Sequence, residues 1–169
     1  MGLYMYLLLD KGRKGKDEIK RIMHSEEFWG NKWKNREEFD GLFIAKWRKA
    51  FGILNWFDHN LESVANQVLP DDDVDREGVQ NYQFYKVKKS ELDELCEICS
   101  DILAVREDEY AVQEIPEDLM PTGDGFFIHA YKNINDWWWH DLEHTVKGIE
   151  EANRHIDWDK DDVYFYVSY

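Results

Sequence analysis

The sequence predicts a single α+β domain over residues 1–169, with a roughly four-stranded mixed sheet packed against three to four helices. A chain of 169 residues can build one full hydrophobic core but is short for two domains. Aromatic residues make up 15% of the chain, which argues against disorder although 34% of the residues are charged. Apolar segments typical of strands also alternate with segments of helical periodicity.

The first half predicts one strand and three helical regions. Residues 2–9 are rich in Tyr and Leu without a polar interruption, which indicates a strand buried on both faces, and residues 10–15 form a turn. A short helix at 17–24 and a partly helical connection at 25–40 follow. From residue 41 to residue 64 the apolar residues are spaced by four and three, which predicts one long amphipathic helix: Phe43, Trp47, Ala50, Leu54, Phe57, Leu61 and Val64.

The second half alternates in the same way. Pro70 ends the long helix and residues 71–75 form an acidic loop. Ser90, with Asp93 three residues later, predicts a helix cap. The predicted elements are, in order, strand 82–87, helix 90–105, loop 107–125, strand 126–131, helix 136–156 and strand 163–169. The last strand carries no charge and would be hazardous as an exposed edge, so we expect it to pair inside the sheet or across a dimer.

The net charge of −15 limits the classes of partner. It repels phosphates and acidic lipids, so neither direct nucleic-acid binding nor membrane binding is expected without a concentrated basic face. The basic run at 11–16 is interpreted as a solvated loop. Two cysteines, Cys96 and Cys99, fit a reducing compartment, and the apolar start at 3–9 is too short for a signal peptide. We therefore expect a cytoplasmic protein.

Cations and tryptophans on the predicted helix 41–64 form the main candidate binding site. Arg48 and Asn55 would lie on one flank of this helix, and Lys49 and Trp56 on the other. Arg offers a planar fork for phosphate, and Trp offers a ring face for a base, so these residues could hold a nucleotide-derived anion. The alternative is that Arg48 pairs with Glu62 or a neighbouring acid and that Trp56 belongs to the core.

A second segment could complete this site. The loop 119–127 contains Thr122 and Gly125, whose backbone could approach a ligand closely, and Trp138 could supply another ring. The same loop is also consistent with an ordinary turn. No cofactor and no metal is expected from these residues.

Metal and catalytic alternatives have less support. His140 and His144 match an inverted zinc-peptidase pattern on a helix, which leaves a zinc-dependent hydrolase as one alternative. Cys96 and Cys99 lack a second pair for zinc, and the segment from Asp73 has Phe84 where a calcium loop requires Glu. No nucleophile motif is present. The protein is therefore more consistent with a binding protein than with an enzyme.

Several motifs together resemble a group of small bacteriophage proteins. They are the opening at 1–7, the Trp47-Arg48-Lys49-Ala50 segment, the segment 119–127 and the aromatic end of the chain. Proteins of that group open Met-Gly-Leu-Asp-Met-Tyr-Leu and carry a Tyr-Trp-Arg-Lys-Ala-Asn helix. This chain differs from them at Tyr4, where Asp is usual, at Phe51 for Asn and at Leu54 for His. The resemblance implies a phage-encoded protein acting in the host cytoplasm.

Three functions remain open from the sequence. The first is a non-enzymatic phage protein that sequesters a nucleotide-derived signalling molecule to counter host defence. The second is an acidic protein that binds and inhibits a host protein by imitating nucleic acid, using the acid clusters at 71–75 and 157–162. The third is the zinc hydrolase. A homo-oligomer is compatible with each of the three.

Overall fold

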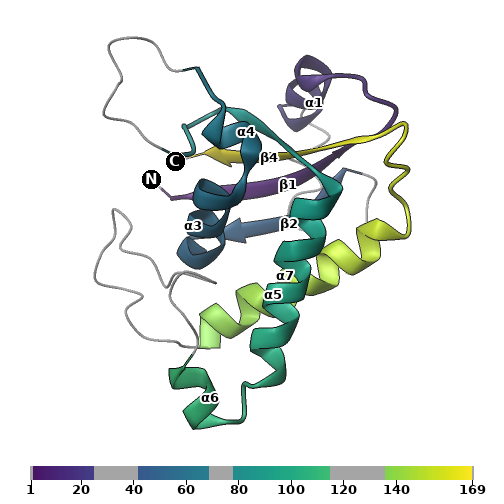
Figure 1. Cartoon of the computed structure of the whole chain (residues 1–169). Coiled ribbons are helices and arrows are strands. Elements are labelled where there is room, and N and C mark those ends of the chain that lie inside the picture. Colours follow the sequence, from purple (N-terminus) through teal and green to yellow (C-terminus); the bar gives the residue numbers. More distant parts are fainter. Residues whose placement is uncertain (1, 25–41, 69–77, 115–135, 169) are drawn as a thin grey trace.

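A computed structural model describes residues 2–24, 42–68, 78–114 and 136–168. They form one antiparallel sheet with the strand order β2-β1-β4-β3 (Figure 1). The four strands are β1 (Tyr4–Asp10), β2 (Phe43–Arg48), β3 (Phe84–Val87) and β4 (Asp162–Ser168). The predicted α+β class is confirmed, but the sheet is antiparallel throughout these strands and not mixed.

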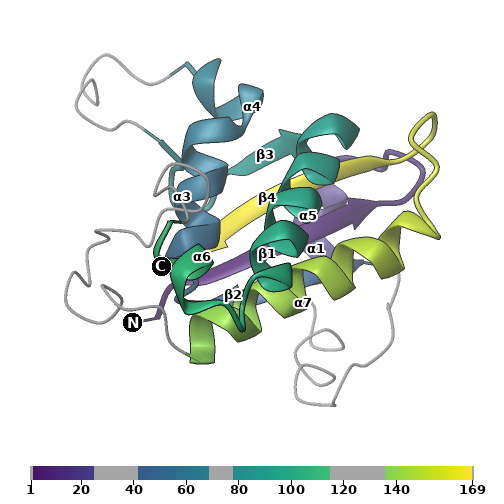
Figure 2. The same cartoon turned by 60° about the horizontal axis from the view of Figure 1, so that its bottom comes forward.

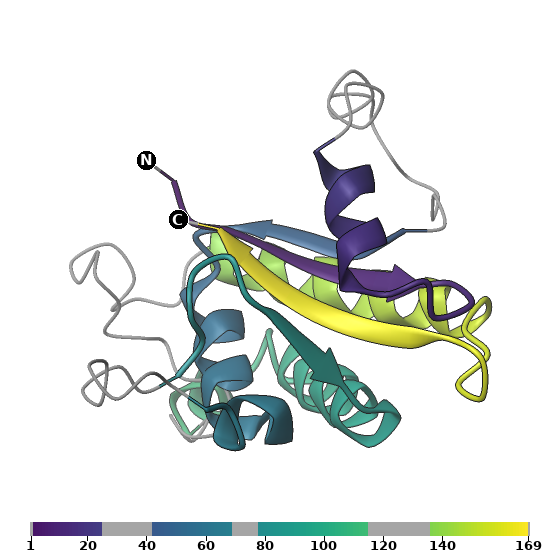
Figure 3. The ribbon, with the colours of Figure 1, turned by 90° about the horizontal axis from the view of Figure 1, so that it is seen from above.

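More helices pack on one face of the sheet than on the other. Figure 3 shows α1 on one side of the sheet and α3 and α5 on the other. The helices are α1 (Lys16–Met23), α3 (Phe51–Asn60), α4 (Glu62–Ala65), α5 (Lys89–Ala104), α6 (Glu109–Gln113) and α7 (Asp136–Asn153). The predicted helices at 17–24, 90–105 and 136–156 are confirmed within a few residues. Helix α6 lies inside the predicted loop 107–125.

Strict alternation along β1 and β4 gives each face of the sheet its own chemistry. One set of side chains packs in the main core with α3, α5 and α7: Met5, Leu7, Leu9, Val163, Phe165 and Val167. The other set packs with α1 and is rich in tyrosine: Tyr6, Leu8, Tyr164 and Tyr166. Successive side chains of a strand point to opposite faces, so a strand that is apolar at every position is buried on both.

Aromatic contacts join the sheet to α3 and α7. The ring of Phe57 on α3 stacks on Phe165 of β4 with centroids 3.9 Å apart. The indole nitrogen of Trp47 on β2 donates a hydrogen bond of 3.0 Å to the hydroxyl oxygen of Thr145 on α7. Trp47 and Thr145 are both buried, so the hydrogen bond satisfies the polar atom that the large indole carries into the core.

Helices also cover backbone groups at both edges of the sheet. At the β2 edge, the backbone N–H of Lys46 donates to Nε2 of His144 on α7 over 3.3 Å. A methyl group at Gly148 would overlap the carbonyl oxygen of Ile44, so glycine lets α7 approach this strand (Figure 2). At the β3 edge, the hydroxyl of Ser63 donates to the carbonyl oxygen of Lys86 over 2.7 Å. Such contacts protect edges from pairing with other chains.

The prediction of one helix over residues 41–64 is wrong for its first part. Residues 43–48 form β2, Lys49 adopts a left-handed φ of 59°, and α3 begins only at Phe51. The register shifts between Leu7 and Leu8 of β1, where Ile44 is the extra residue of β2. This bulge breaks the alternation of apolar residues, so the strand periodicity is hidden in the sequence and the spacing matches a helix.

Three smaller predictions have different outcomes. The predicted cap of α5 by Ser90 and Asp93 is wrong, because the helix begins at Lys89 and the Glu91 carboxylate accepts the Lys88 N–H over 2.7 Å. The uncharged strand at 163–169 does pair inside the sheet, between β1 and β3. The predicted strand 126–131 lies outside the described residues.

Candidate functional site

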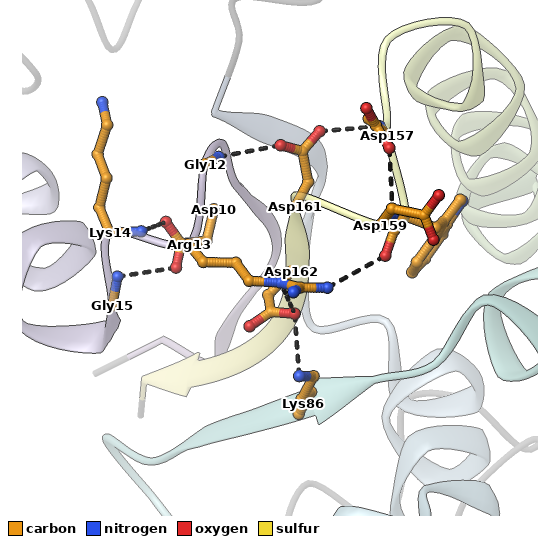
Figure 4. A network of polar contacts seen from close by, with 11 residues as sticks. Asp10, Gly12, Arg13, Lys14, Gly15, Lys86, Asp157, Asp159, Asp161 and Asp162 are labelled. Carbon is orange, nitrogen blue, oxygen red and sulfur yellow. Dashed lines mark hydrogen bonds and ion pairs between the residues drawn. The ribbon is translucent and has the colours of Figure 1, made fainter.

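Charged residues gather at both ends of the central β1–β4 pair. At one end, the turn after β1 is held by the carboxylate of Asp10, which accepts the backbone N–H of Lys14 over 2.8 Å and of Gly15 over 2.9 Å (Figure 4). Left-handed backbone at Gly12, Arg13 and Gly15 turns these N–H groups inward. The turn therefore resembles a phosphate-binding loop in shape, but a carboxylate of the chain already occupies it.

Asp161 fixes the same turn from the start of β4. Its carboxylate is 2% exposed and accepts hydrogen bonds from Lys11 Nζ (2.8 Å), Gly12 N (2.9 Å) and Asp157 N (2.8 Å). Burial acts to raise the pKa of Asp161, but these hydrogen bonds outweigh it and hold the pKa below the usual 3.8. The Lys11 ammonium also donates to the His155 carbonyl oxygen, so it takes the place that a bound cation would have.

Asp162 completes this group, which we call the turn network: Asp10, Lys11, Gly12, Arg13, Lys14, Gly15, Asp157, Asp161 and Asp162. The Asp162 carboxylate pairs with Arg13 at 3.2 Å and with Lys86 of β3 at 2.9 Å. The basic run is solvent-exposed, as expected, but its backbone donors are held by the carboxylates of the acid cluster at 157–162 and by Asp10. Of the four acids in that cluster, Asp161 and Asp162 are turned inward, whereas the side chains of Asp157 and Asp159 are exposed.

A hollow of about 160 Å³ lies beside the turn network and under α1. Its lining is Leu9, Asp10, Lys11, Lys14, Glu18, Ile19, Ile22 and Leu42. Pockets that bury ligands of drug or nucleotide size usually measure several hundred Å³. The hollow is therefore too small for a nucleotide.

The opposite end of the sheet carries a different arrangement, the cation–tyrosine strip, formed by Tyr4 and Tyr6 of β1 with Lys46 and Arg48 of β2. Tyr4 pairs with Arg48 and Tyr6 with Lys46 in the strand register. The Arg48 guanidinium carbon lies 5.8 Å from the centroid of the Tyr4 ring. The Lys46 ammonium lies 6.0 Å from the Tyr4 centroid and 5.7 Å from that of Tyr6. These distances are those of cation–π contacts.

The strip combines positive charge with neutral rings. Burial, with the neighbouring Tyr4 and Tyr166, raises the pKa of Tyr6 to about 12, so its phenol stays uncharged at neutral pH. Arg48 is exposed, and among the described residues it has no carboxylate partner. Gly2 lies against the strip, because a methyl group there would come within 3.3 Å of the Tyr4 ring. Among the described residues, therefore, no ion pair at Arg48 competes with an anion at the strip.

The structure separates most of the sequence-predicted site residues. Arg48 and Lys49 remain adjacent at the end of β2, and the Lys49 N–H donates to the Leu3 carbonyl oxygen over 3.1 Å. Asn55 lies on α3 and is half-buried. Thr122 and Gly125 lie outside the described residues. Arg48 and Asn55 therefore do not share a helix flank.

Both tryptophans proposed for ring stacking lie in the core. Trp56 is 1% exposed and meets Phe57 with centroids 5.3 Å apart, which confirms the alternative that it is a core residue. Trp138 is 7% exposed and its ring lies 4.8 Å from that of Trp139. The other half of that alternative is not seen among the described residues, where Glu62 pairs with Lys88 and Arg48 has no carboxylate partner.

The two histidines of α7 do not form a metal site with the described residues. Their rings stack with centroids 6.3 Å apart, but Nε2 of His144 accepts the Lys46 N–H. Within the described ranges no group of three His, Cys, Asp or Glu side chains could hold a metal ion. Burial raises the pKa of Asp141, on the same helix, to about 7. Burial also raises the pKa of Cys96 and Cys99, which makes reactive thiolates unfavourable.

Sequence reasoning missed three of the four strip residues: Tyr4, Tyr6 and Lys46. The signal available was the alternation of Lys46 and Arg48, which places both on one face only if the segment is a strand. Comparisons of the chain with protein families, with curated proteins and with solved structures found no match. No helix in the described part of the chain has the length and apolar character needed to cross a membrane.

Proposed function

We propose that this protein is a non-enzymatic binding protein that captures a nucleotide-derived anion on the cation–tyrosine strip. The observation that carries the proposal is the exposed Arg48 guanidinium, 5.8 Å from the centroid of the Tyr4 ring. A guanidinium binds phosphate oxygens through two parallel hydrogen bonds, and a phenol ring offers a face to a base. Lys46 adds a second charge on the same face of the sheet.

The resemblance to bacteriophage proteins suggests the biological role. In that group an Asp stands where this chain has Tyr4, directly opposite Arg48 in the strand register. A carboxylate at this position would neutralise the guanidinium, whereas tyrosine leaves it able to bind an external anion. Capture of a host signalling nucleotide during infection is the role that we propose.

Calorimetry with cyclic dinucleotides and with ADP-ribose tests the proposal. Arg48→Ala should weaken binding by about tenfold or more, because a charge-assisted hydrogen bond contributes about 1.5–3 kcal/mol. Arg48→Lys should recover part of the loss, since it keeps the charge but not the fork. The matched control is Arg154→Ala, which removes an exposed arginine that pairs with Glu151 on α7.

Two results would contradict the proposal. One is the absence of heat with all of these compounds at micromolar protein. The other is equal loss of affinity in Arg48→Ala and Arg154→Ala, which would mean that net charge alone attracts the ligand. A lower affinity that is fully explained by partial unfolding of Arg48→Ala, measured by its melting temperature, would also assign Arg48 a structural role.

A further inference from the structure

Lys46 of the strip is held from outside the strip, by α7. Its backbone N–H faces the open edge of β2 and donates to Nε2 of His144 over 3.3 Å. A ring nitrogen accepts a hydrogen bond only when it carries no proton, so this contact requires the neutral imidazole with its proton on Nδ1. The His144 ring also meets the Trp47 ring edge to face, with centroids 6.3 Å apart.

Neighbouring contacts make this hydrogen bond part of a fixed register between α7 and β2. Trp47 donates to Thr145, the residue after His144, over 3.0 Å. One turn further along α7, Gly148 lies so close to the Ile44 carbonyl oxygen that a methyl group would not fit. Helix α7 therefore contacts β2 along its outer edge, and His144 supplies the one titratable side chain among these contacts.

The charges around His144 favour its neutral form. Burial, His140 and Lys147 lower its pKa below the usual 6.5. The Lys46 N–H donates to the ring nitrogen, so this contact also favours the neutral ring. On β2, the charged residue that contacts His144 is Lys46, through its backbone N–H. From the turn after α5, Arg106 pairs with Glu143, the residue before His144, at 2.7 Å. Asp141 lies three residues before His144 on α7, and burial raises its pKa to about 7, so its carboxyl group takes up a proton in mild acid. Among the described residues no carboxylate forms an ion pair with His144.

We propose that His144 is a positioning residue for the strip: its neutral imidazole fixes the β2 edge that carries Lys46 and Arg48, and its protonation in mild acid releases that edge. This inference rests on the proposed function for its effect on binding. Acid should then weaken anion binding at the strip. General electrostatics predicts the opposite, because protonated histidines make the protein less negative. The sign of the pH effect thus separates the two mechanisms.

Hydrogen exchange of the Lys46 amide, followed by NMR together with the His144 ring signals, tests the contact without any ligand. In the wild type the protection factor should fall by about fivefold as the His144 signals titrate below pH 6.5, since a net hydrogen bond contributes about 1 kcal/mol. His144→Gln keeps an acceptor but does not titrate, so its protection should not change with pH. His140→Gln should show the same loss of protection, displaced to higher pH, because it removes one of the charges that lower the His144 pKa.

Binding of ADP-ribose between pH 5 and pH 7.5 tests the effect on the strip. The wild type and His140→Gln should lose affinity in acid, whereas His144→Gln should not. A Lys46 protection factor that stays constant while His144 titrates in the wild type overturns the inference, and so does the same loss of protection in His144→Gln. If ADP-ribose and cyclic dinucleotides do not bind at any pH, the proposed function fails, while the exchange experiment still decides whether His144 holds Lys46.

Discussion

Cations lie near both ends of β1, but the two ends use them differently. At the turn network, Lys11 and Arg13 pair with Asp161 and Asp162, and the backbone N–H groups of the turn point at carboxylates (Figure 4). At the cation–tyrosine strip, Arg48 lies over a neutral ring. The comparison shows that the cations of the turn network are paired with carboxylates of the chain, whereas Arg48 has no carboxylate partner among the described residues.

Among the variants that test this comparison, substitution of Asp161 should change the free energy of unfolding most. Asp161→Asn should lower the free energy of unfolding by about 2–4 kcal/mol, because the buried carboxylate accepts hydrogen bonds from Lys11, Gly12 and Asp157. Urea unfolding followed by tryptophan fluorescence measures the change. Asp159→Asn is the matched control, because its exposed side chain lies two residues away. Equal stability of the two variants would show that the turn network does not hold the loops.

The pH dependence of stability also tests whether the Asp161 carboxylate stabilises the turn network. The pKa of Asp161 is lower in the folded protein than its usual 3.8, so its contribution to stability is present above about pH 4 and is lost as the pH falls through the folded pKa. The stability difference between the wild type and Asp161→Asn should therefore be full at pH 6 and shrink in acid. Unfolding curves between pH 2 and pH 6 measure it. A difference that is constant over this range would contradict the assignment.

The smallest expected effect compares one arginine from each end of the sheet. Arg13→Ala should cost about 0.5–1 kcal/mol of stability, since Arg13 pairs with Asp162 and donates to the Trp158 carbonyl oxygen. Arg48→Ala should cost no more than about 0.5–1 kcal/mol, because an exposed cation–π contact contributes on that order to folding. Denaturant titrations of both variants give the two values. A larger loss in Arg48→Ala would place the strip among the structural features of the fold.

Much of the fold could be predicted from the sequence because local patterns agree with it. The uninterrupted apolar character of β1 and β4 and the four–three spacing on α5 and α7 each identify their element. The prediction of a helix where β2 lies was wrong for a local reason, because the bulged residue Ile44 breaks the alternation of apolar residues that identifies a strand. Helix α6 has a recognisable start, Asp108, whose side chain accepts the N–H groups of Tyr110 and Ala111.

The candidate site could be predicted only in part. Arg48 was identified from its residue type, but its partner Tyr4 is distant in the sequence and becomes a neighbour only through the pairing of β1 with β2. The roles expected for Trp56 and Trp138 depended on helix flanks, and the tertiary packing buries both rings. Residue type therefore indicated the chemistry, whereas strand register decided which groups lie together.

The central position of β4 has a consequence for how the chain folds. Lys11 and Asp161, which join the ends of β1 and β4, are 150 residues apart in the sequence. On a growing chain β1 can pair with β2 alone until β4 has been synthesised, and a two-stranded ribbon is only marginally stable. Closing so long a loop is entropically costly and slows folding. The four-stranded sheet should therefore assemble late, only after β4 has been synthesised.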